Sequence, residues 1–145
     1  MFSLAINNQS STSLPDTQIL SLCRFVLSSL KIKNAELSLA FVSLPVMRRL
    51  NLSYRGQNRT TDVLSFIFDG SKKNLSGEII ICLPVAKRQA RHFNHPLYRE
   101  IFRLLVHGLV HLAGYDHVKA EDAVVMENLE NRLLQLYILS VRKNK

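Results

Sequence analysis

The chain has 145 residues, 47% of them hydrophobic, and carries 19 Lys and Arg against 11 Asp and Glu, a formal net charge of +8. This length suits one buried core, so we expect a single domain over residues 1–145. No apolar run approaches the roughly 18 residues that span a bilayer, and the N-terminal segment lacks signal-peptide features. We therefore expect a cytoplasmic protein without a membrane partner, whose positive surface favours polyanions such as nucleic acids.

The first quarter of the chain predicts a strand, a helix and a second strand. Residues 2–6 form a short strand, and a polar loop then leads to Asp16, a candidate N-cap. Apolar residues recur at helical spacing from there to Leu30. Residues 35–43 alternate apolar and polar side chains, as a strand with one buried face does.

The middle of the chain predicts a helix followed by two neighbouring strands. Pro45 suits the first turn of a helix that runs to Arg55, and Gly56 marks its end. The segments 63–68 and 78–83 are rich in β-branched and aromatic residues and are separated by turn-forming residues. We expect these two strands to pair.

The last part of the chain predicts three helices, over 84–93, 99–114 and 121–143, the second stopped by Gly114. The third has acidic residues in its first turn and basic ones in its last, which suits the helix dipole. The resulting fold class is α/β (α+β): a single domain in which about five helices cover a small mixed sheet of about four strands.

Three histidines lie close together in HGLVHLAGYDH: His107, His111 and His117, spaced H-x3-H-x5-H. The first two lie on one helix face, one turn apart, and a chain reversal at Gly114 would let His117 approach the same ion. Three imidazoles match a catalytic zinc site with an open fourth position, placed on a helix and the loop after it. Asp116 is a candidate carboxylate for orienting a ligand histidine.

The alternative is a set of core histidines bonded to backbone carbonyls, but each unsatisfied ring nitrogen would cost about 1–3 kcal/mol. A bound metal, one ion per chain, is the simpler interpretation. We predict that the bound metal is zinc, although imidazoles also bind nickel and copper. The glutamate of the H-E-x-x-H protease motif is replaced by Gly108. A glycine here is expected to leave room over the metal for a large substrate.

Arg55 lies at the helix-to-loop junction, where a guanidinium could contact a phosphate with two hydrogen bonds. Arg48, Arg49 and Arg59 are expected to be ordinary surface residues. The run KRQAR is typical of a solvated helix face.

Other features are expected to have ordinary structural roles. His92 and His95 are expected to be surface or capping residues. Cys23 and Cys82, far apart in apolar stretches, predict buried thiols. An apolar stripe on the last helix predicts core packing, and it comprises Val125, Leu129, Leu133 and Leu136.

HGLVHLAGYDH, with YRGQNRTTDVLSF upstream and MENLE downstream, resembles the YbeY family of zinc-dependent bacterial endoribonucleases that act in rRNA maturation. The resemblance covers the region from about Leu50 to Glu130. It implies that His107, His111 and His117 are the metal ligands and that Arg55 is a cleft arginine needed for activity.

The resemblance also implies an α/β domain that cleaves single-stranded RNA, processes the 3′ end of small-subunit rRNA and takes part in ribosome quality control. The partners it implies are small-subunit ribosomal proteins and a ribosome-associated GTPase. The chain departs from the family pattern at Asn58, Thr60, Ile67 and Glu78, where Asp, Pro, Pro and Asp are usual. These positions affect loop shape more than the proposed chemistry.

The predicted reaction is zinc-assisted cleavage of an RNA phosphodiester, with Arg55 stabilising the charge of the transition state. The attacking group, water or the RNA 2′-OH, stays open. One rival is a zinc hydrolase of peptides or small amides. Another is a non-catalytic RNA-binding assembly factor whose metal only stabilises the fold.

Overall fold

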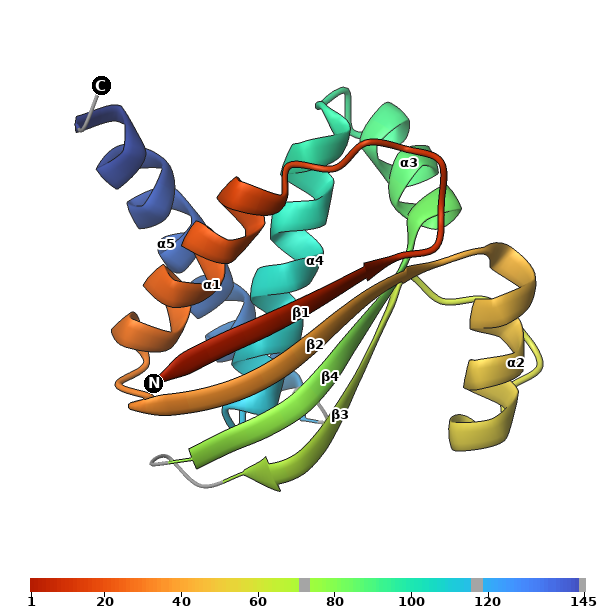
Figure 1. Ribbon diagram of the computed structural model, residues 1–145, viewed down its shortest axis with the longest axis horizontal. Coiled ribbons are helices and arrows are strands. Elements are labelled where there is room, and N and C mark those ends of the chain that lie inside the picture. The colour runs from red at the N-terminus through yellow and green to blue at the C-terminus, as the bar shows by residue number, and fades with distance from the viewer. Residues whose placement is uncertain (71–73, 116–118, 144–145) are drawn as a thin grey trace.

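The computed structural model describes residues 1–70, 74–115 and 119–143. One four-stranded sheet is overlaid by helices (Figure 1). The strands are β1 (Phe2–Asn8), β2 (Asn34–Val42), β3 (Val63–Gly70) and β4 (Asn74–Cys82). The helices are α1 (Asp16–Ser29), α2 (Leu44–Arg55), α3 (Leu83–His92), α4 (Leu97–Leu112) and α5 (Ala120–Lys143).

The sheet has the strand order β1-β2-β4-β3, with β4 in its interior. β1, β2 and β4 are parallel, whereas β3 pairs antiparallel with β4, so the sheet is mixed. Residues 63–68 and 78–82 do pair, as the sequence predicted. The α/β prediction, with four strands and five helices, is confirmed.

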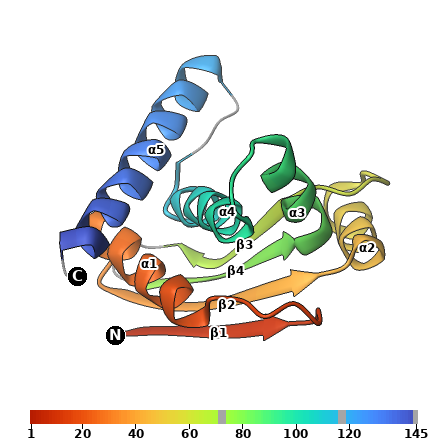
Figure 2. The same ribbon diagram turned by 90° about the horizontal axis from the view of Figure 1, so that it is seen from above.

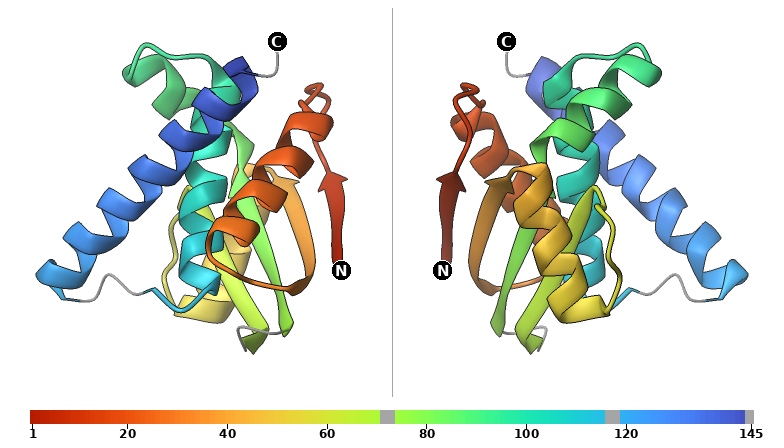
Figure 3. Two further views of the ribbon diagram at one scale, coloured as in Figure 1. Left: turned by 90° about the vertical axis from the view of Figure 1, so that its left-hand side faces the viewer. Right: turned by 90° about the vertical axis from the view of Figure 1, so that its right-hand side faces the viewer.

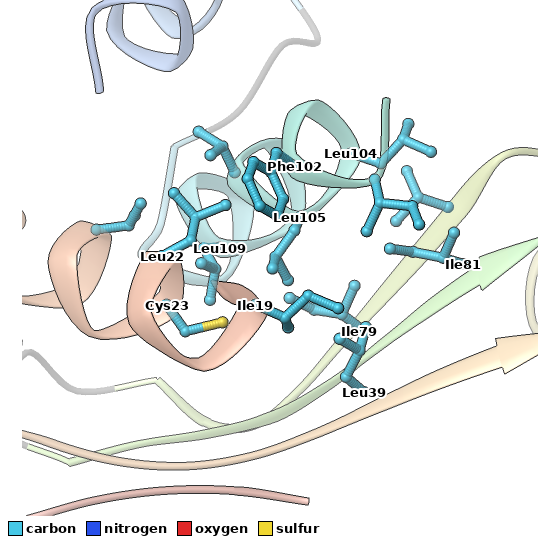
Figure 4. Packing of buried hydrophobic residues seen from close by; sticks show 14 of the residues in the cluster. Ile19, Leu22, Cys23, Leu39, Ile79, Ile81, Phe102, Leu104, Leu105 and Leu109 are labelled. Carbon is cyan, nitrogen blue, oxygen red and sulfur yellow. The ribbon is translucent and has the colours of Figure 1, made fainter. Parts of the chain in front are cut away.

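The larger of two apolar clusters lies between the sheet and helices α1, α4 and α5. Alternate strand residues, such as Leu39 and Ile79, face Ile19 of α1 and Leu105 of α4, as Figure 4 shows. Figure 2 shows α1, α3, α4 and α5 on the same side of the sheet. The alternation predicted for 35–43 therefore buries one strand face beneath these helices.

A smaller cluster uses the opposite strand residues and is covered by α2. Met47 of α2 packs with Val42, Leu64 and Ile80. The N-cap of α2 is Ser43, whose side-chain oxygen accepts the Val46 backbone N–H, and its C-cap is Gly56 with φ of +68°. The predicted stop at Gly56 is thus correct.

Two local expectations need correction. Asp16 is the first helical residue and not the N-cap, which is Pro15. On α5 the predicted stripe is only partly buried, since Val125 and Leu136 are exposed, while Met126 and Tyr137 are buried. The predicted stop of α4 at Gly114 is confirmed: the helix ends at Leu112, and Gly114 follows the C-cap Ala113 with φ of +105°.

Both thiols are buried as predicted, and Cys23 has no exposed surface. Burial raises the pKa of the Cys23 thiol to about 12, because the thiolate would lose its hydration. Burial also raises the pKa of Cys82 above its ordinary value. Both thiols are therefore protonated and inert at neutral pH.

Candidate metal centre

Helix α4 carries two histidines beside the face that packs on the sheet. Its residues Ile101, Leu105 and Leu109 are buried in the larger cluster. Four residues correspond to about 400° of helical rotation, so the side chains of His107 and His111 leave the helix in nearly the same direction, one turn apart. Both are partly exposed.

A carboxylate from the last helix orients the first of these histidines. Nδ1 of His107 lies 2.6 Å from Oε1 of Glu130 on α5. An ionised carboxylate can only accept, so the ring donates its Nδ1 hydrogen, and in the neutral ring Nε2 then carries the lone pair. Glu130 is only 14% exposed and His107 is 32% exposed, so the contact is shielded from water on the Glu130 side.

The packing of α5 explains how Glu130 reaches His107. Met126, Leu133 and Tyr137 are buried in the larger cluster, and Leu129 packs against it. Glu130 is one turn after Met126, so the buried face of α5 carries it to α4. Glu130 was not predicted from the sequence, although it ends the MENLE segment. A contact between two helices, 23 positions apart, gives no local signal.

An ion pair with a buried carboxylate lies on α4, one to two turns before His107. The carboxylate of Glu100 has no exposed surface and accepts from Nε and Nη2 of Arg103, at 3.0 and 2.6 Å. Nε2 of His95 lies 3.0 Å from the same carboxylate. Hydrogen bonding to Glu100 raises the pKa of Arg103, with burial opposing it. His95 is therefore partly buried and holds Glu100, which corrects the prediction of a surface or capping residue.

Gly108 has a different role from the one predicted. A Cβ atom built on Gly108 would lie 3.1 Å from two side-chain carbons of Ile79, on β4. Gly108 therefore faces the sheet and allows α4 to approach it closely. A residue one position along a helix points about 100° away, so Gly108 lies on a different side of α4 from His107.

Arg55 is the last residue of α2 and is exposed. α2 packs against α3, and α3 packs against α4. The right-hand view of Figure 3 shows the C-terminal ends of α2 and α4 at the same end of the molecule, with β3 between them. Arg55 and the two histidines thus come from separate elements, and their side chains are not placed in contact.

The comparisons with known proteins agree with one another. A family model described as Endoribonuclease YbeY matches residues 5–138. The Endoribonuclease YbeY of Finegoldia magna is 44% identical over 113 residues, which cover 76% of this chain and 74% of the relative. That of Saccharopolyspora erythraea is 36% identical over 144 residues, covering 91% and 79%. The chain belongs to the YbeY family.

One solved structure shows the same fold as this YbeY family member. It is the solution structure of TM1509 from Thermotoga maritima, with a TM-score of 0.66 and 26% identity. The match covers 98% of this chain and 93% of that one. The suggested resemblance to the family is therefore confirmed over nearly the whole chain, beyond the region from Leu50 to Glu130 that carried it.

Part of the predicted site of this YbeY chain falls outside the described residues. His117, the third proposed ligand, and Asp116, the proposed orienting residue, lie outside the described residues. Within 1–70, 74–115 and 119–143 no three His, Cys, Asp or Glu residues form a group that could hold a metal. In these same ranges no helix is long and apolar enough to cross a bilayer.

The donor set that is described suits a zinc-type ion. Two imidazoles from one helix face provide borderline-soft nitrogen ligands. A carboxylate on Nδ1 of His107 fixes the tautomer in which Nε2 can bind a metal. Such carboxylate–histidine pairs are common around protein-bound zinc.

Proposed function

We propose that this protein is a metal-dependent endoribonuclease that cleaves single-stranded RNA and acts in rRNA maturation. Membership of the YbeY family supports the endoribonuclease activity. The observation that carries the metal proposal is the contact between His107 and Glu130, which prepares one imidazole as a ligand. We propose His107, His111 and His117 as the ligands of one zinc ion.

A zinc ion held by these histidines would supply Lewis acidity for phosphodiester cleavage. The protein's own residues provide position and charge. Glu130 holds the ring of His107 in one orientation. Arg55 would neutralise the extra charge that develops on the phosphoryl oxygens in the transition state.

The place of action proposed here is the small ribosomal subunit. The substrate would be the 3′ end of its rRNA, and the partners would be small-subunit proteins and a ribosome-associated GTPase. The fixed charge of +8 supports an RNA partner, because a basic surface attracts polyanions.

The test combines metal content with RNA cleavage in the purified protein and in His111→Ala. We expect near-stoichiometric zinc and cleavage of single-stranded RNA in the parent protein, with both lost in the variant. Metal without cleavage in the parent would favour an assembly factor or another hydrolase. A parent protein that carries no bound metal would indicate a purely structural role for the histidines.

A further inference from the structure

The positive charge of this protein is concentrated in two segments. Residues 43–61 contain four arginines, residues 83–93 contain Lys87, Arg88 and Arg91, and neither segment contains an Asp or Glu. These seven account for almost all of the net charge of +8, because the rest of the chain is nearly balanced. The segments comprise α2 with its following loop and α3, which pack together.

A groove of about 580 Å³ lies between these elements. Arg48 and Arg49 of α2 and Arg88 of α3 line it, and all three are exposed. Its remaining lining is apolar or uncharged and comprises Leu44, Pro45, Leu52, Asn58 and Thr60. The groove thus combines cationic groups with an apolar surface.

The three arginines keep their charge available to a ligand. In the part of the chain that the structure describes, none forms an ion pair with a carboxylate. Nε of Arg48 donates to Oδ1 of Asn58 at 2.8 Å, which orients the guanidinium without neutralising it. Arg48 is therefore held in position with its full positive charge.

The groove leads toward Arg55. Residues 48, 52 and 55 follow the i, i+4, i+7 spacing of one helix face, and the first two line the groove. Arg55 therefore continues that face at the C-terminal end of α2.

We propose that this groove binds the strand of single-stranded RNA that enters the cleavage site. The proposal rests on the proposed function and names the path of its substrate. Arg48, Arg49 and Arg88 contact successive phosphates, and the apolar lining contacts sugars and bases. Grooves that bind single strands without sequence preference combine positive charge with such surfaces.

The experiment measures binding of a fluorescent 12-nucleotide single-stranded RNA by anisotropy, across a range of salt concentrations. The RNA carries 2′-O-methyl groups, and its integrity is checked on a gel. The test variant is Arg48→Gln/Arg49→Gln/Arg88→Gln. Each lost phosphate contact lowers the salt slope for a single strand by about 0.7, so we expect a slope smaller by about 2 and about a hundredfold weaker binding at 0.1 M salt.

A matched control removes the same charge from another groove. A groove of about 550 Å³ at β1 and α1 is lined by Arg24, Lys31 and Lys33. Replacement of these three by Gln should change the salt slope by less than about 0.5 if they make no phosphate contacts. An equal or larger effect of the control would overturn the proposal.

Asn58→Asp is a second, nearly isosteric test. The new carboxylate would pair with Arg48, and we expect about fivefold weaker RNA binding at 0.1 M salt, the equivalent of one lost contact. Unchanged RNA binding in both this variant and the triple variant, with melting temperatures preserved, would refute the proposal that the groove binds RNA. Displacement of the RNA by polyglutamate at the same concentration of charge would also refute it, by showing a site for any polyanion.

Cleavage is assayed separately on unmodified RNA, so the two proposals can fail independently. A parent protein that cleaves RNA, with a triple variant that binds normally, would refute only the groove. A parent protein that binds RNA through the groove and never cleaves it with zinc present would refute only the proposed function.

Discussion

At the scale of single residues, contact with Glu130 determines the tautomer of His107, which its position in α4 alone does not. The contact at 2.6 Å fixes which ring nitrogen carries hydrogen, and therefore which nitrogen can bind a metal. His111 takes its direction from the same helix face. The proposed centre thus depends on the packing of α5 as well as on the spacing of histidines.

Glu130→Gln should weaken zinc binding. The amide can still accept from Nδ1 of His107, but without a negative charge it makes the ring a weaker ligand. Loss of such an orienting partner commonly costs 10- to 100-fold in metal affinity. Competition with a chromophoric chelator measures this, with Glu127→Gln on the exposed side of α5 as the control. Equal zinc affinities in the parent and Glu130→Gln would contradict the role assigned to Glu130.

Arg55→Ala should slow RNA cleavage by about 10² or more, because loss of one preorganised charge contact commonly costs about 3–4 kcal/mol in the transition state. Zinc content should be unchanged. Single-turnover cleavage rates test this against Arg99→Ala, an exposed arginine in the first turn of α4. A rate for Arg55→Ala within threefold of the control would remove Arg55 from the mechanism.

The sequence was informative about residues within one element and less so about contacts between elements. The spacing of His107 and His111 predicts their shared helix face. The contact of Glu130 with His107 and that of Glu100 with His95 form only when helices and loops pack. Gly108 was misinterpreted because spacing does not show which side of a helix meets the sheet.

At the scale of elements, close contact between α4 and the β3–β4 pair sets the position of the histidine face. Gly77 on β4 shows how close: a Cβ atom there would lie 2.6 Å from the backbone oxygen of Phe66 and 3.2 Å from a side-chain carbon of Leu112. Leu112 directly follows His111 in the chain. Any displacement at Gly77 would thus reach the end of α4.

Gly77→Ala should destabilise the protein by about 1–3 kcal/mol, as overpacking of a core usually does, because a backbone carbonyl cannot move aside as a side chain can. Urea unfolding would show a lower midpoint with an unchanged slope. Ser76→Ala, the neighbouring substitution on the same strand, serves as the control. A urea midpoint equal to that of the parent would show that β3 and β4 move apart to accommodate the new methyl group without loss of stability.

The predicted elements were correct because each has a regular apolar period, and errors arose where more than one face is apolar. On α5, Val125 and Leu136 follow helical spacing as well as Met126 and Tyr137 do. Contact with α1 and α4 selects the second set. The sequence alone could not make that choice, since it does not show where the partners of α5 lie.

At the scale of the whole molecule, the proposed metal would couple binding to stability. A ligand that binds only the folded state at 1,000 times its Kd adds about 4 kcal/mol. For a domain of this size each kcal/mol raises Tm by about 2–4 °C, so EDTA should lower Tm by roughly 10 °C. Differential scanning calorimetry measures this, and His111→Ala should be insensitive to EDTA. A parent Tm unaffected by EDTA, in protein shown to carry zinc, would contradict the coupling.

The uneven distribution of charge makes the molecule an electric dipole. The basic groups lie on α2, its following loop and α3, whereas the first half of α5 carries Glu121, Asp122, Glu127 and Glu130. In the field of a polyanion such a molecule experiences a torque as well as an attraction. It therefore turns α2 and α3 toward the polyanion before contact, so that a larger share of collisions begins in the orientation that binding needs.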